Sequence, residues 1–155
     1  MAAPEHALPA IGSELVTVAI GGQQFAIDIM VVREIRGWTT STPLPHAPSY
    51  VLGMINLRGA VLPVVDLGMR LGLSACVRDN SAVVVVAQIG GREVGLLVDE
   101  VCDILTVSEN MLQEPPDVGA DGLDDFVRGV ITTDEGIVTL LTLDGVLPPA
   151  MQDAA

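Results

Sequence analysis

The feature that most constrains the fold is an internal repeat. Ile20-Gly21-Gly22 recurs as Ile89-Gly90-Gly91, each time between two apolar runs. In both halves a proline-containing loop follows, and then a hairpin that begins with glycine and ends near an aspartate, about seventy positions apart in the two copies. We interpret this order as a duplication that gives two similar β subdomains of about five short strands each. Because each unit is too small to bury much surface alone, we expect the two to share an apolar core.

The first copy contains a predicted β-hairpin whose two runs, Val51–Leu57 and Ala60–Val65, flank Arg58-Gly59. Gly59 can adopt the positive φ that a tight turn requires. Pro63 has no backbone N–H, so we expect the second run to be an edge strand or to carry a bulge. Arg58 at the tip is either a solvated turn residue or a point of recognition.

Two short helices are also expected. Asp66 is a suitable N-cap for one or two helical turns in which Leu67 and Leu71 share a face, and Gly72 is a suitable end. A second short helix is predicted within Asp28–Ile35, where apolar residues recur at helical spacing, and it should lead into an extended segment, Ile35–Trp38.

The apolar run Val83–Val86 is continuous rather than alternating, as in a strand covered on both faces. It is either the seam between the subdomains or a patch that a partner covers. We expect a flexible tail at residues 1–12 and one domain at residues 13–150. Its first subdomain should span about 14–80 and its second about 81–146, with exchange of strands between them left open.

The net charge of −13 comes entirely from one part of the chain. There is no lysine; residues 1–92 carry six acidic side chains and six arginines, whereas residues 93–155 carry fourteen acidic side chains and Arg128. Nucleic acid and anionic membranes are therefore poor partners, because both bind basic surfaces. The acidic half is either a solvated face or the surface for a separate partner. The longest apolar run, Ala82–Ala87, is too short to span a membrane and the N-terminus has no secretory pattern, so we expect a cytoplasmic protein.

No catalytic or metal-binding constellation is apparent. Cys76 and Cys102 are isolated and are expected to be reduced and partly buried, with no metal and no cofactor. Residues 64–68 loosely resemble the loop of aspartic proteases, and Asp144 could supply the second carboxylate of an aspartic hydrolase. Leu67 stands where those enzymes have a hydroxyl, so Asp66 is better explained as a helix cap. We therefore predict a non-enzymatic interaction module.

Several segments of the chain together resemble the CheW family, the coupling proteins of bacterial chemotaxis. They are Ile27-Asp28-Ile29, Val32-Arg33-Glu34-Ile35-Arg36, Gly53-Met54-Ile55-Asn56-Leu57-Arg58-Gly59, Val61-Leu62-Pro63-Val64-Val65-Asp66-Leu67, Arg70-Leu71-Gly72-Leu73 and Val94-Gly95-Leu96-Leu97-Val98-Asp99-Glu100-Val101. The resemblance covers about Glu14–Val146. It implies a mostly β fold of two SH3-like five-stranded barrels packed together, with minor short helices.

The resemblance also implies a function. CheW proteins are scaffolds that couple the cytoplasmic tips of methyl-accepting chemoreceptors to the regulatory domain of the histidine kinase CheA, a two-component system. An adaptor of another kinase circuit, such as twitching motility, is the alternative within that class. Gly68 stands where the family often has arginine, and the short ending with Pro148-Pro149 makes a long C-terminal helix doubtful.

Candidate binding residues follow from the matching positions. For the receptor these are Ile29, Val32, Glu34 and Arg58, and for the kinase Gly53, Asn56, Leu57, Arg58 and Gly59. Ile29 and Val32 could equally be core residues. We expect Glu34 and Arg58 to face each other, either as an ordinary surface ion pair or so that Arg58 is oriented for a partner. The second copy has Thr132-Thr133-Asp134-Glu135 in place of this tip, which is where the first hairpin should have a binding role of its own.

Overall fold

The computed structural model describes residues 9–39, 41–73, 82–113, 126–134 and 136–146. It consists of two β-sheets with a 3-10 turn, η1 (Ile29–Val31), and one short helix, α1 (Leu67–Arg70). Sheet A contains, in spatial order, β8 (Glu100–Thr106), β1 (Glu14–Ile20), β2 (Gln23–Asp28), β11 (Gly136–Leu141), β10 (Val127–Thr133) and β9 (Leu112–Gln113). Sheet B contains, in spatial order, β3 (Val32–Gly37), β6 (Val83–Ile89), β7 (Arg92–Val98), β5 (Ala60–Asp66) and β4 (Val51–Leu57).

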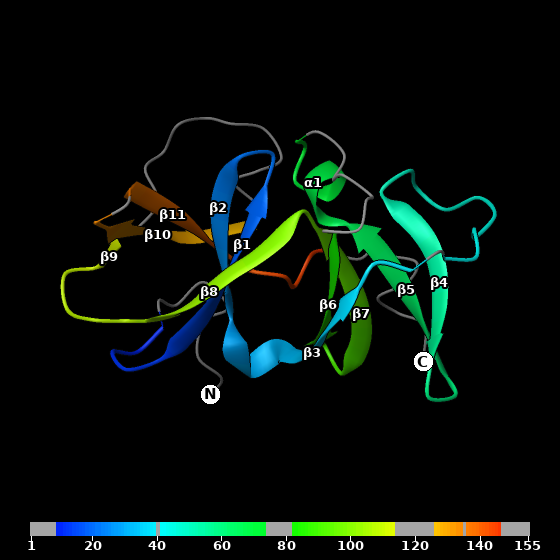
Figure 1. The fold of residues 1–155 in the computed structure, drawn as a ribbon, viewed down its shortest axis with the longest axis horizontal. Coiled ribbons are helices and arrows are strands. Elements are labelled where there is room, and N and C mark those ends of the chain that lie inside the picture. The colour runs from blue at the N-terminus through cyan, green and yellow to red at the C-terminus, as the bar shows by residue number, and fades with distance from the viewer. Residues whose placement is uncertain (1–8, 40, 74–81, 114–125, 135, 147–155) are drawn as a thin grey trace.

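The mostly β fold with minor helices is therefore confirmed. Figure 1 shows sheet A and sheet B side by side, with α1 between them at the top of the view. No helix within the described residues is long and apolar enough to cross a membrane. The predicted flexible tail falls mostly outside the described residues, as does Cys76.

The two halves of the chain exchange their first hairpins. Sheet A combines the hairpin β1–β2 from the first half with strands β8 to β11 from the second, and sheet B combines β6–β7 with β3 to β5. The exchanged hairpins join through parallel pairs, β2 with β11 and β7 with β5. The sheets thus do not divide at residue 80; each contains strands from both predicted subdomains.

Both sheets repeat the same arrangement. In sheet B the pairs Val51↔Val65 and Gly53↔Val64 enclose a bulge. The pairs at the corresponding positions of sheet A, between β10 and β11, enclose an equivalent bulge. The turns also match, since φ is 59° and 82° at Gly21 and Gly22 and 58° and 81° at the glycines of the second copy. The order β8-β1-β2-β11-β10 in sheet A corresponds to β3-β6-β7-β5-β4 in sheet B.

The main core joins the two sheets. It includes Val16, Val18 and Phe25 of sheet A together with Val85 and Leu96 of sheet B, each at most 3% exposed. The run in β6 is covered on both faces as predicted, because its three central valines are at most 2% exposed. A second, smaller core lies within sheet A and includes residues of β1, β2, β10 and β11.

The prediction for Pro63 was wrong. β5 is an interior strand between β7 and β4, and the extra residue of the bulge lies on β4, after Val51. The parallel pairing of β5 with β7 is confined to Val64–Asp66. Pro63 precedes this segment, so its missing N–H falls where β7 does not pair.

The helix predicted within Asp28–Ile35 is shorter than expected. The Asp28 carboxylate accepts a hydrogen bond from the N–H of Met30 and caps the three-residue turn η1, and the chain is extended from Val32 onward. β3 pairs with the buried strand β6 from Val32 to Gly37, with Arg33 as the extra residue of a bulge, and this pairing replaces helix. The helix after β5 is confirmed: Asp66 Oδ1 accepts from the Met69 N–H at 3.1 Å.

Candidate functional site

An ion pair links β3 to the tip of the β4–β5 hairpin. Arg58 Nη2 donates to Glu34 Oε1 at 2.5 Å, and Arg36 Nη1 lies 3.3 Å from Glu34 Oε2. The prediction that Glu34 and Arg58 face each other is confirmed. The Arg58 side chain is 71% exposed, so its guanidinium remains accessible while one of its nitrogens is held.

The backbone at the tip fixes the direction of Arg58. Arg58 and Gly59 have φ values of 51° and 88°, as the two central residues of a type I′ hairpin turn require. Asn56 Oδ1 accepts a hydrogen bond from the Gly59 N–H at 3.0 Å, which stabilises the turn. A positive φ is unfavourable for arginine, and strained residues of this kind concentrate at functional sites.

The electrostatics follow from the geometry. The hydrogen bond from Arg58 holds the pKa of the Glu34 carboxyl below its ordinary value, and Arg36 adds to this effect. The same bond raises the pKa of Arg58. Both groups are therefore charged at neutral pH, and the tip presents a cation that is partly neutralised from one side.

Several apolar side chains lie on the elements that carry this ion pair or on the turn before β3. Ile29 and Val32 are half-buried and pack against the main core, so each combines a core role with partial exposure. Met30, Ile35 and Val61 are 79%, 48% and 60% exposed, although no local sequence pattern separates them from core residues. Met30 lies on the three-residue turn η1, and Ile35 lies on β3, an edge strand of sheet B.

Two of the predicted kinase-binding residues are not at the surface. Leu57 is 8% exposed, and Gly53 is buried beneath the preceding loop. Gly53 has φ 151°, and a Cβ there would lie 2.1 Å from the Thr42 carbonyl oxygen. Thr42 and Met54 pair through two backbone hydrogen bonds of 2.9 and 2.8 Å at this point. Gly53 permits this close approach, and Asn56, Arg58 and Gly59 form the exposed part of the hairpin.

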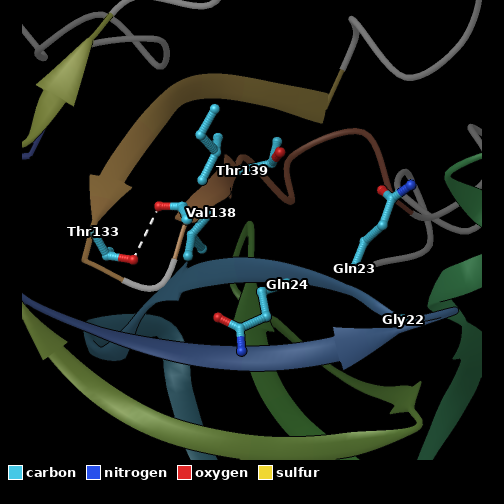
Figure 2. A pocket seen from close by; sticks show the side chains of 8 residues that line it. Gly22, Gln23, Gln24, Thr133, Val138 and Thr139 are labelled. Carbon is cyan, nitrogen blue, oxygen red and sulfur yellow. Dashed lines mark hydrogen bonds between the residues drawn. The ribbon is translucent and has the colours of Figure 1, made fainter.

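No predicted binding residue lines the pocket in Figure 2. This open pocket of about 400 Å³ lies between the starts of β2 and β11 and is lined by Gly22, Gln23, Gln24, Thr133, Gly136, Ile137, Val138 and Thr139. Thr133 Oγ1 donates to the Gly136 carbonyl oxygen across one end of it. In the part of the chain that the structure describes, no three His, Cys, Asp or Glu side chains gather as metal ligands.

Cys102 differs from the expectation. It is a free, exposed thiol on β8, an edge strand of sheet A, rather than a partly buried one. Partial desolvation, with the nearby Glu100 and Asp103 carboxylates, raises its pKa, so the thiolate is disfavoured at neutral pH.

A mostly β domain with an accessible charged hairpin tip and several exposed apolar side chains has the features of a protein-interaction domain. Residues 14–150 match the model of the CheW-like domain. The chain belongs to the CheW family of chemotaxis scaffolds, which are non-enzymatic adaptors.

Individual relatives support this assignment. The chain is 51% identical over 144 residues to the chemotaxis protein CheW of Rhizobium meliloti (strain 1021), covering 93% of each chain. It is 27% identical to Protein FrzA of Myxococcus xanthus, covering 98% of each chain. The crystal structure of the scaffolding protein TtCheW from Thermoanaerobacter tengcongensis superimposes with a TM-score of 0.81 at 28% identity, covering 88% of this chain and 92% of that one.

Proposed function

We propose that this protein couples the cytoplasmic tips of chemoreceptors to the regulatory domain of a CheA-type histidine kinase. The proposal places the protein in the cytoplasm, where both partners would meet it. The observation that carries it is the Glu34–Arg58 pair, in which an exposed guanidinium is held in one direction at the end of a rigid hairpin. Membership in a family of chemotaxis scaffolds supports the same conclusion.

The two proposed contacts share Arg58 but extend in different directions. The receptor surface comprises Ile29, Val32 and Glu34 where the chain passes from sheet A into sheet B. The kinase surface comprises Asn56, Arg58 and Gly59 on the hairpin, with Gly53 and Leu57 supporting its shape from below. Arrays multiply such small contacts, so each isolated affinity is expected to be modest.

The test is calorimetric titration of the full chain with a CheA regulatory domain and, separately, with a receptor-tip fragment. We expect the wild-type protein to bind both, and Arg58→Glu to weaken at least one by about tenfold or more with circular dichroism unchanged. Arg92→Glu is the matched control, because Arg92 is at the start of β7 outside the proposed surface. Failure of the wild-type protein to bind either partner would refute the proposal.

A charge-swapped variant separates binding from folding. In the double substitution Glu34→Arg with Arg58→Glu, the ion pair is kept but the tip becomes acidic. If Arg58 itself contacts a partner, binding stays weak in this variant. If the swap restores binding, the pair has only a structural role and the recognition surface lies elsewhere.

A further inference from the structure

Arg70 connects the two sheets. At the end of α1 in the sheet B half, its Nε donates to the Val146 carbonyl oxygen and its Nη2 to that of Gly145, both at 2.7 Å. Gly145 and Val146 follow β11 of sheet A. The guanidinium carbon also lies 4.6 Å from the ring centroid of Tyr50 and 4.9 Å from that of Phe126.

These contacts lie where the two halves of the repeat meet. Tyr50 directly precedes β4 and Phe126 directly precedes β10, its counterpart. The carbonyl oxygen of Tyr50 accepts from the Asp66 N–H at 2.8 Å, and that of Phe126 accepts from the Thr142 N–H at 2.7 Å. Arg70 therefore contacts two equivalent aromatic rings, one from each half.

The carbonyl acceptors are equivalent in the same way. Counting from the paired ends of β5 and β11, Gly145 and Val146 occupy the positions that Met69 and Arg70 occupy in the first half. Arg70 thus donates to its own counterpart. Because the counterpart of Arg70 is a valine, the second copy has no equivalent cation at this position. The hydrogen bonds therefore run in one direction only, from Arg70 of the first half to the backbone of the second half.

Directional contacts matter here because the sheets otherwise join through apolar packing. Within the described residues, no strand of sheet A is paired with a strand of sheet B. Near the β7–β8 connection, the Asp99 N–H donates to the Ala19 carbonyl oxygen and Asp99 Oδ2 accepts from the Gly21 N–H. Apolar contact is not directional, so polar contacts such as these set the angle between packed layers.

We propose that Arg70 is a positioning residue that fixes the orientation of sheet A relative to sheet B and thereby shapes the receptor-binding surface. The second part of this inference rests on the function proposed above. In the receptor surface, Ile29 lies on η1 where the chain leaves sheet A, whereas Val32 and Glu34 lie on β3 of sheet B, so the position of Ile29 relative to the other two depends on the angle between the sheets. The kinase surface lies on the β4–β5 hairpin within sheet B and does not depend on that angle.

The first experiment measures the orientation directly, without any partner. Spin labels are attached to cysteines introduced at Ile137 on β11 and Val61 on β5, which are 69% and 60% exposed, with Cys76 and Cys102 replaced by serine. Double electron–electron resonance then gives the distribution of distances between the two spin labels. We expect Arg70→Met to broaden or shift this distribution, and the control Arg92→Met to leave it unchanged.

Arg70→Lys shows which contact is responsible and guards against a variant that merely unfolds. Lysine keeps a cation near both rings but cannot present the planar fork that reaches two carbonyls. We expect a distribution between those of wild type and Arg70→Met, with circular dichroism unchanged in all three. A wild-type distribution in Arg70→Met overturns the proposal, and a wild-type distribution in Arg70→Lys excludes the paired hydrogen bonds as its cause.

The second experiment titrates the unlabelled variants with both partners. We expect Arg70→Met to weaken binding of the receptor tip by on the order of tenfold, as is typical of coupling between sites, and to leave binding of the kinase domain unchanged. Equal loss of both, or loss of neither, contradicts the link to receptor binding. If the wild-type protein binds no receptor tip but the distances still change, the proposed function fails while the positioning role stands.

Discussion

Sheet A and sheet B carry carboxylates at corresponding positions of one edge strand but opposite charges at the corresponding hairpin tips. Glu34 on β3 pairs with Val86, four residues before a Gly-Gly turn, and Asp103 on β8 pairs with Thr17, four residues before the equivalent turn. The hairpin tips correspond as well, so that Asp134 stands in sheet A where Arg58 stands in sheet B.

The same scaffold therefore has an ion pair in one sheet and two acids in the other. Asp103 and Asp134 both line an open pocket of about 410 Å³. In sheet B the corresponding carboxylate is bonded to Arg58 and Arg36. Strand register and the conformation of the Gly-Gly turns are alike in the two halves, but the charge at the hairpin tip is not.

Replacing Gly53 by alanine should lower the free energy of unfolding by about 3 kcal/mol, because the added Cβ meets the Thr42 carbonyl in a strained backbone conformation. Chemical denaturation measures the loss. The control is Gly37→Ala on β3, where φ is not positive and no described atom beyond the neighbouring residues lies within 4 Å of the added Cβ. Its loss of unfolding free energy should stay within about 0.5 kcal/mol. Equal stability of the two variants would show that the loop over β4 need not approach so closely.

The residues at the ends of β5 and β11 should also differ in how much they stabilise the fold. Asp66 caps α1, and Asp66→Ala should cost about 1 to 2 kcal/mol of unfolding free energy. The hydroxyl of its counterpart Thr142 caps no helix among the described residues and donates to Asp144 Oδ2 at 3.3 Å, which is a long hydrogen bond. Thr142→Ala should therefore lower the free energy of unfolding by less than about 1 kcal/mol. Thermal unfolding of both variants measures the two losses. A larger loss at Thr142 would reverse this ranking.

Asp134→Arg should build the missing ion pair into sheet A. The new guanidinium enters the pocket that Asp103 also lines, and the gain in stability should be below about 1 kcal/mol. A double-mutant cycle with Asp103→Asn measures the coupling, which should fall at high salt. The variant Asp134→Gln removes the acid without adding a cation. Absence of coupling would mean that the two sheets differ in shape at the tip as well as in charge.

The smallest effect concerns acid titration. Because Arg58 lowers the pKa of Glu34 in the folded state, the stability that this group contributes is present above its unfolded pKa and is lost as the pH falls through the folded pKa. In Arg58→Gln the pKa of Glu34 should rise toward its ordinary value, with Arg36 still lowering it somewhat. Carbon-detected NMR titration measures this. An unchanged midpoint would assign the shift to Arg36 alone.

Features set by neighbouring residues were predictable from sequence. The Gly-Gly turns, the cap at Asp66 and the turn at Arg58-Gly59 each depend on a few consecutive side chains. The Glu34–Arg58 pair could be predicted because the resemblance brought together two segments that local patterns leave apart. The buried run in β6 followed from its continuous apolar pattern.

Features set by distant pairing were not predictable. Nothing near Pro63 indicates that β7 lies beside β5, because that strand arrives from the other half of the chain. The same applies to Val32, whose helical spacing was overridden by the pairing of β3 with β6. The contacts of Arg70 join residues 75 and 76 positions apart and depend on a junction that exists only when both sheets have formed.

The exchange of hairpins has a consequence for synthesis of the chain. β1 and β2 are made first, yet their neighbours β8 and β11 are among the last strands to leave the ribosome. At about 5 to 20 residues per second, the open edges of this early hairpin wait roughly ten seconds for partners. Sheet B, whose strands lie between residues 32 and 98, can be completed meanwhile. The order of synthesis thus lets sheet B form before sheet A, and it leaves the β1–β2 hairpin with unpaired strand edges, which are prone to aggregation, until β8 and β11 follow.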